Sequence, residues 1–233
     1  MAWIAGVDGC KAGWIATFLD SGTLRLECGV FPSFAAILGP PYSPRIVAVD
    51  MPIGLADTGQ RQCDVEARRL LQARRSSVFP PPIRPVLHVD DYPEVNASSK
   101  ELHGKGLSKQ AFYLMPKIRE VEAVVLSRPA AQIRECHPEL CFQALNGSAP
   151  LPASKRTPAG AERRRRLLAS VYGDDLARLA TSEVGTMRGV GFDDLYDALA
   201  LLWTASRILR GEAERVPHDP PSDSRGLLME IVY

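Results

Sequence analysis

The sequence has no excess of charge of either sign and no long hydrophobic run. Its 28 Lys and Arg residues stand against 27 Asp and Glu residues, which leaves a formal net charge of +1. Such a balance predicts no global attraction to nucleic acid or to a membrane surface. No apolar run approaches the roughly 18 residues that a transmembrane helix needs. A site for a polyanion must therefore be local.

Cysteine is sparse, and the sequence contains no CxxC pair among its five cysteines. A chain of 233 residues can bury a sizeable core without disulfides, so this usage fits a reducing compartment. The first residues, MAWIAGVDGC, lack the basic and the long apolar regions of a signal peptide. The composition excludes disordered, collagen-like and coiled-coil classes. We expect a cytoplasmic protein with one domain over residues 1–233.

The hydrophobic pattern predicts an α/β fold. Short apolar runs predict strands at residues 2–8, 13–19, 23–30, 45–50 and 131–136, with a further strand-like run at 227–233. Amphipathic patterns predict helices at residues 31–38, 62–73, 108–127, 158–172 and 192–210. Because the first three strands are joined by short turns, we expect them to form an antiparallel meander. Parallel strands would follow.

A proline-rich segment interrupts this pattern at residues 74–92, which we expect to form a loop. Long irregular segments are uncommon in compact domains, and residues 56–128 are therefore interpreted as an insertion or lid. Pro116 should kink its helix or begin a new one. Ser76, Ser77 and Phe79 could line a pocket, or the loop could simply be a rigid connection.

Several carboxylates lie where predicted strands end or where the last helix begins. Asp8, Asp50 and Glu135 end strands, and such ends face the crevice that binds ligands in α/β proteins. Asp194 and Asp197 are three residues apart in the last helix and so share a face, whereas the apolar stripe Leu195, Leu199 and Leu202 packs elsewhere on the helix. Any one of these acids alone could be a turn residue or a favourable charge at a helix start.

A convergence of these acids would require a cation. Two carboxylates about 4 Å apart repel by roughly 4 kcal/mol at an effective dielectric near 20. Only Lys11 is adjacent in sequence to Asp8, Asp50 or Asp197. A divalent metal is the economical counterion, and oxygen ligands favour Mg²⁺ or Mn²⁺.

Several motifs resemble one family over nearly the whole chain. They are GVDGCKAGW at 6–14, DMPIGL at 50–55, RQCDVEAR at 61–68, SSVFPPP at 76–82, ECHPELCF at 135–142 and DDLYDALA at 193–200. Together they resemble the domain-of-unknown-function 429 family, a predicted nuclease of RNase H-like fold. The run from Asp194 to Ala200 also resembles the last helix of RuvC-type resolvases.

This resemblance implies a fold and a site. It implies an RNase H-like mixed five-stranded sheet, with a three-stranded antiparallel meander, then parallel strands, flanking helices and an inserted helical and loop segment. Metal ligands would be Asp8, Asp50, Asp194 and Asp197, with Asp8 bridging two ions; Glu135 has no fixed counterpart but is kept as a catalytic candidate. The implied activity is that of a metal-dependent nuclease or phosphodiester hydrolase, acting on nucleic acid or a phosphorylated substrate.

Two basic stretches are hidden by the neutral total. Residues 61–75 hold five Arg, and residues 155–166 hold six Lys and Arg. Such stretches can bind phosphates, and the candidates within or beside the motifs are Lys11, Arg61, Arg68 and Lys117. In the second stretch, Arg163 to Arg166 surround most of a helix, so we expect at least two of them to be solvated.

Two other sites and two other functions stay open. Cys136, His137 and Cys141 fall short of the four ligands of a zinc site, and Cys63 fits a small buried residue better than a nucleophile. GVDGCKAGW could instead be a phosphate loop of an actin-like ATPase or phosphotransferase, although the sequence contains no convincing second copy of that domain. A non-catalytic nucleic-acid-binding protein is the third alternative.

Overall fold

A mixed five-stranded sheet forms the centre of the computed structural model, which describes residues 2–128, 132–182 and 189–233. The strand order is β3-β2-β1-β4-β5. The strands are β1 (Trp3–Cys10), β2 (Gly13–Asp20), β3 (Leu26–Phe31), β4 (Ile46–Val49) and β5 (Gln132–Glu135). The first three pair antiparallel, β4 runs parallel to β1, and β5 runs parallel to β4. The predicted α/β class, with a meander followed by parallel strands, is confirmed.

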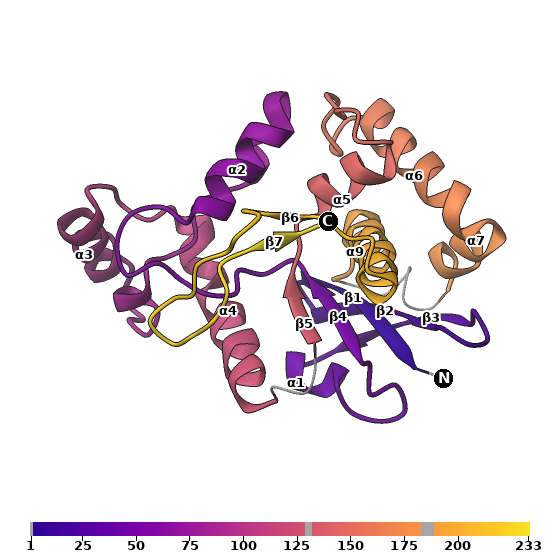
Figure 1. Ribbon diagram of the computed structural model, residues 1–233, viewed down its shortest axis with the longest axis horizontal. Helices are drawn as coiled ribbons and strands as arrows, with labels where there is room; N and C mark the ends of the chain where they lie inside the picture. The colour runs from indigo at the N-terminus through magenta and orange to yellow at the C-terminus, as the bar shows by residue number, and fades with distance from the viewer. Residues whose placement is uncertain (1, 129–131, 183–188) are drawn as a thin grey trace.

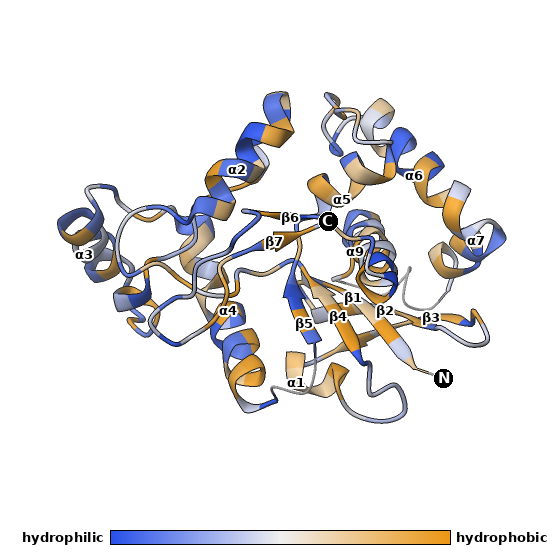
Figure 2. Ribbon diagram, in the orientation of Figure 1, coloured by the Kyte–Doolittle hydropathy of each residue, from blue (hydrophilic) through white to orange (hydrophobic). Residues whose placement is uncertain are grey.

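The sheet is covered on both faces. One face carries α1 (Phe34–Ile37) and α4 (Lys109–Ser127), and the other carries α9 (Phe192–Arg210), as Figure 1 shows. Strands buried on both faces have near-continuous apolar sequences. Figure 2 accordingly shows β1, β2 and β4 as mainly hydrophobic, whereas the edge strand β5 is mainly hydrophilic.

Helix α9 packs most closely on the sheet. The stripe Leu195, Leu199 and Leu202 is fully buried against β1, β2 and β4, as predicted. Gly6 permits this contact, because a Cβ at that position would come 2.1 Å from the Ala198 carbonyl oxygen. The helix runs over the predicted residues 192–210.

The helices beside α9 were only partly predicted. α6 (Pro158–Tyr172) begins with the predicted proline, but α5 (Pro138–Leu145) and α7 (Asp174–Ala180) were missed. Both are short, with eight and seven residues, so their sequences span too few turns for a clear helical period. α5 and α6 lie on the same side of the C terminus in Figure 1.

The segment 56–128 contains more helix than expected. α2 (Gln62–Leu71) is followed by the 3₁₀ turns η1 (Gln72–Ser77) and η2 (Arg84–Val86), and then by the unpredicted α3 (Tyr92–His103). The prediction of a loop over 74–92 was therefore wrong at both 3₁₀ turns. Pro116 lies inside α4 without ending it. Met115 and Ile118 of α4 belong to the main core, so this part of the segment supports the sheet.

The C-terminal part of the chain forms a small second sheet. β6 (Arg215–Val216) pairs antiparallel with β7 (Ile231–Val232), so the predicted run at 227–233 is a strand only near its end. These strands pack with α2 around Cys63, Leu71 and Ile231. Across the described part of the chain, no helix is both long enough and apolar enough to cross a membrane.

Candidate functional site

The parallel strands bring acidic residues to one edge of the sheet. Asp8 lies near the end of β1, and Asp50 follows β4 directly. The Asp50 N–H donates to the Val7 carbonyl oxygen at 3.0 Å, and the Cys136 N–H donates to that of Val49 at 2.9 Å. These bonds fix the strand ends beside one another. The edge therefore presents Asp8 and Asp50 together, with His137 next to them after β5.

Helix α9 supplies two more carboxylates. Gly6 and the Thr17 hydroxyl, which donates to the Ala198 carbonyl oxygen at 3.0 Å, seat the helix on β1 and β2. Asp197, one residue earlier, is consequently 3% exposed. Asp194 accepts the Gly191 N–H at 2.8 Å and so also caps the helix. Asp194 is thus a helix-start residue, as the alternative from the sequence had it, and it also lies in the same cavity as the other acids.

These four acids line one cavity of about 240 Å³, here called the acidic cavity. Its wall also contains Arg61, Asp64, Ser77, Phe79, Gln110, Glu135, His137 and Lys155. The four acids that the resemblance implies as one site, Asp8, Asp50, Asp194 and Asp197, thus line the same cavity. Ser77 and Phe79 line this cavity, which favours the pocket-lining alternative over a plain rigid connection.

The cation among these acids is Lys155. Its ammonium forms an ion pair with Asp197 and lies 4.0 Å from the Asp193 carboxylate. Lys155 lies in the loop before α6, 42 residues from Asp197 in sequence. Sequence adjacency had pointed to Lys11, which is instead exposed in the β1–β2 turn. Adjacency failed because a loop that is distant in sequence folds over the site.

The carboxylates have raised pKa values. Burial, followed by repulsion from Asp50, Asp197 and Asp194, holds the pKa of Asp8 well above its usual range, and Lys155 opposes this shift. Burial raises the pKa of Asp197 to about 7, although its ion pair with Lys155 favours the charged form. Burial also raises the pKa values of Asp50 and Asp194. Lys155 thus compensates these acids only in part, with further favourable contributions from His137 at Asp50 and from Lys11 at Asp194.

The donor chemistry of the cavity fits a divalent cation, because Mg²⁺ and Mn²⁺ prefer carboxylate oxygens. The positions of these side chains, however, do not form a metal site. Among the residues that the structure describes, no three His, Cys, Asp or Glu side chains form a group that could hold a metal ion. Asp197 faces Lys155 instead. A metal in this cavity would therefore require the carboxylates to move closer together, and Asp197 could become a ligand only by leaving its lysine partner.

Glu135 belongs to a buried ionic network. Its two carboxylate oxygens accept from the two Nη atoms of Arg61 at 2.7 Å each, and one of them also accepts the Ile53 N–H at 2.6 Å. Arg61 further donates to Asp64 from Nε at 2.9 Å and from Nη2 at 2.6 Å. The contacts of Arg61 and Glu135 thus fix the segment after β4 to the start of α2.

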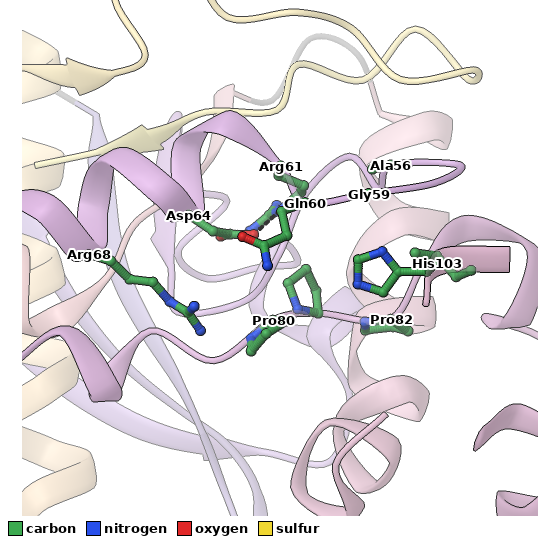
Figure 3. Close-up of a pocket in the computed structure, with 11 residues that line it drawn as sticks. Ala56, Gly59, Gln60, Arg61, Asp64, Arg68, Pro80, Pro82 and His103 are labelled. Atoms are coloured by element: carbon green, nitrogen blue, oxygen red, sulfur yellow. Dashed lines mark hydrogen bonds and ion pairs between the residues drawn. The ribbon is translucent and has the colours of Figure 1, made fainter. Parts of the chain in front are cut away.

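Arg68 and the proline-rich segment lie behind this network. Arg61, Asp64 and Arg68 line a cavity of about 20 Å³ together with Pro80, Pro82 and His103, seen in Figure 3. This volume holds about one water molecule and excludes a substrate. The Arg68 Nε donates to the Val78 carbonyl oxygen at 2.8 Å. The residue therefore holds the loop that carries Phe79.

Lys117 lies outside the acidic cavity. Its ammonium donates to the Gly13 carbonyl oxygen at 2.5 Å and lies 4.3 Å from the Trp14 ring centroid. These contacts hold the β1–β2 turn against α4. Of the four basic candidates from the sequence, only Arg61 lines the acidic cavity.

A larger cleft of about 460 Å³ adjoins the acidic cavity, and we call it the outer cleft. The two share Asp50, Ser77, Phe79, Gln110, His137, Lys155 and Asp197. The outer cleft, but not the acidic cavity, is also lined by Arg74, Ser76 and Arg156. Arg74 is paired with Glu139, which also binds the buried Arg164. Arg163, Arg165 and Arg166 are exposed, as expected for the basic helix.

The sequence reasoning missed Lys155, Arg156 and Glu139 as parts of the site. The only local signal was the basic character of residues 155–166. Cys63 is fully buried, which agrees with its interpretation as a small buried residue. Cys136 and Cys141 are buried beside one another. Burial raises the pKa of the Cys63 thiol, which disfavours a thiolate nucleophile.

Comparison with known proteins gives a family but no function. The sequence model of a family described as "Protein of unknown function (DUF429)" matches residues 6–222. No curated protein and no solved structure matches the chain. The matched range contains every candidate site residue considered above.

Proposed function

The chain belongs to the DUF429 family of proteins of unknown function, and on the basis of its acidic cavity we propose that it is a metal-dependent phosphodiester hydrolase. One observation carries this proposal. Carboxylates from β1, from the end of β4 and from α9 line one cavity at the carboxyl edge of the sheet, and Lys155 is paired with one of them, Asp197.

The fold supports the same proposal by analogy. A meander of three strands, a parallel fourth strand followed by Asp50, and a late helix carrying Asp194 and Asp197 correspond to the pattern expected for an RNase H-like fold. This correspondence is with a fold, and many functions can share a fold. The proposal therefore depends on the carboxylates themselves.

In the proposed activity, Asp8, Asp50, Asp194 and Asp197 would hold Mg²⁺ or Mn²⁺. Such an ion supplies an activated water and stabilises the leaving oxygen. Lys155 keeps the buried carboxylates compensated until that ion binds. Arg61 and Glu135, bound to one another and to the backbone at Ile53 and Gly54, keep the floor of the cavity in place.

The outer cleft would receive the substrate. Arg156 is exposed there, and within the described ranges its guanidinium has no carboxylate partner. Gln110, which lines both cavities, supplies an amide donor. These groups can bind phosphate oxygens while the acids lie beyond them. The partner we propose is accordingly a nucleic acid or a smaller phosphorylated substrate.

We place this activity in the cytoplasm, as the sequence predicts. All five cysteines are free, which suits a reducing compartment. The actin-like alternative would need a second copy of its domain. In the described part of the chain there is one five-stranded sheet and one two-stranded sheet, and neither repeats the other.

A hydrolysis assay tests the proposal. Methyl p-nitrophenyl phosphate with Mn²⁺ should be cleaved by the wild-type protein and by Asp219→Asn, whose side chain is 93% exposed. Asp8→Asn should lose roughly a hundredfold or more, because metal stabilisation of the transition state amounts to several kcal/mol. Wild-type turnover in Asp8→Asn would overturn the proposal.

A further inference from the structure

A fourth cavity, of about 370 Å³, lies between α6 and the first turns of α9. Phe192 and Tyr196 line it, and we call it the aromatic pocket. It shares Lys155 and Asp197 with the acidic cavity, and it shares Arg156 with the outer cleft. A ligand that fills the aromatic pocket would therefore extend directly to the acids.

The two aromatic residues lie one turn apart on α9. Residues four apart share a helix face, so both rings border the same space. Phe192 is 57% exposed, although it is one of the most hydrophobic side chains of the helix. Burial raises the pKa of Tyr196, which keeps its hydroxyl neutral. Isolated exposed apolar residues are common on protein surfaces, but Phe192 lies beside a second ring and a cavity.

The charged side chains around the aromatic pocket favour a polar ligand. Arg156 lines both the aromatic pocket and the outer cleft, and no carboxylate among the described residues neutralises it. Lys155 lines both the aromatic pocket and the acidic cavity. The Asp193 carboxylate is 58% exposed and can accept hydrogen bonds. A purely apolar ligand would leave these groups unused. A flat, polar, aromatic ligand attached to a phosphate would use all of them.

We propose that the aromatic pocket binds a nucleobase stacked on Phe192 and Tyr196, and that the adjoining phosphate lies between Arg156 and the acidic cavity. Stacking of bases on aromatic side chains, next to a basic groove that contacts the backbone, is a general mode of single-strand recognition. This inference rests on the proposed hydrolase function and specifies its substrate as a nucleotide-containing phosphodiester.

Binding to an inactive protein tests this inference separately from catalysis. The Asp8→Asn variant, which we expect to bind no Mn²⁺, is titrated calorimetrically in EDTA with thymidylyl-(3′,5′)-thymidine and with the same sugar-phosphate lacking both bases. The dinucleotide should bind about tenfold or more tightly than the compound without bases. Phe192→Ala in that background should abolish the difference, whereas Tyr113→Ala, which removes a 72% exposed ring on α4, should retain it.

Three results would overturn the base pocket: equal affinity for both compounds, a preference that survives Phe192→Ala, or no binding of the dinucleotide. The hydrolase proposal is decided independently by methyl p-nitrophenyl phosphate, which has no base. Metal-dependent cleavage of that compound, together with any of these three results, would leave the hydrolase standing without its nucleobase pocket.

Discussion

The ammonium group of Lys155 is paired with the carboxylate of Asp197 inside a cavity that also contains Asp8 and Asp50. This pair includes one of the four acids that the family resemblance implies as metal ligands. It compensates Asp197 while leaving Asp8 with a strongly raised pKa. If the proposed metal ion binds among these acids, Lys155 would compete with it for Asp197.

Replacement of Lys155 by Met should strengthen Mn²⁺ binding. Without the ammonium, Asp197 is free to become a ligand and the uncompensated charge attracts the ion more strongly. We expect the dissociation constant at pH 8 to fall about tenfold, which corresponds to about 1.4 kcal/mol. Calorimetric titration measures it, with Lys105→Met, at an exposed position, as the control. Unchanged or weaker binding in Lys155→Met would show that the lysine does not compete.

Asp8→Asn should stabilise the metal-free protein at high pH. A carboxyl whose pKa is raised by folding is protonated in the native state and ionised when unfolded, so stability falls as pH rises from 3.8 toward the raised value. Asn removes this loss, and its side-chain oxygen can still accept the Gly9 N–H. Each pKa unit is worth about 1.4 kcal/mol.

Urea unfolding in EDTA at pH 4 and pH 8 measures this effect. The variant and the wild type should be nearly equal at pH 4, and the variant should have the higher free energy of unfolding at pH 8. Asp219→Asn should show no such pH-dependent gain. A less stable Asp8→Asn at pH 8 would contradict the repulsion that we assign to the site.

Arg61→Ala should be far more damaging than Arg68→Ala. Removal of Arg61 leaves Asp64 and Glu135 buried without their cation, and breaking a buried ionic network costs about 3–5 kcal/mol. Arg68 loses one hydrogen bond to Val78, worth about 1 kcal/mol. Chemical denaturation distinguishes the two. Equal losses would mean that the network contributes no more than an ordinary loop contact.

Glu135→Gln should preserve metal-dependent hydrolysis. Both oxygens of Glu135 are engaged by Arg61, and one is also engaged by the Ile53 N–H, so the side chain has a positioning role in this account. Gln keeps one oxygen acceptor. The assay is cleavage of methyl p-nitrophenyl phosphate, with Asp50→Asn expected to lose it. A properly folded Glu135→Gln without activity would instead indicate a direct catalytic role.

Gly6→Ala should prevent α9 from packing on β1. The added Cβ would come 2.1 Å from the Ala198 carbonyl oxygen and 2.2 Å from the Leu202 nitrogen, and backbone atoms cannot move aside cheaply. Overpacking of this kind costs about 1–3 kcal/mol or more. Gly39→Ala, whose Cβ would meet its nearest atom at 3.5 Å, is the matched control. Thermal unfolding should show a large loss only at Gly6.

The elements that the sequence predicted best are those with long or strongly patterned apolar runs. The strands β1 and β4 and the helix α9 fall within a few residues of their predicted bounds. In α3, by contrast, only Val95 and Ser99 are buried, so hardly any apolar period marks the helix. α5 and α7 have at most eight residues, which is too short for a period to be read reliably.

Within the site, the residues that could be predicted are those whose place follows from a predicted strand or helix. Asp8 and Asp50 end predicted strands, Asp194 and Asp197 share a helix face by their spacing, and the family resemblance implied that these four acids, which line one cavity, belong to one site. Lys155 could not be predicted, because a loop between α5 and α6 has no period that places its side chains. The same holds for Arg68 and Lys117, whose partners Val78 and Gly13 are backbone carbonyls that no sequence pattern identifies.

Calorimetric titration of Mn²⁺ into the purified wild-type protein, beside Asp8→Asn, tests the central claim most directly. We predict binding to the wild type without any nucleotide and its loss in Asp8→Asn, because burial, and then repulsion from the neighbouring carboxylates, raises the pKa of Asp8, and an ion beside these groups would relieve that repulsion. No binding to the wild type, or equal binding to both proteins, would contradict a carboxylate metal site in the acidic cavity. Binding that requires added ATP would point to phosphotransfer instead.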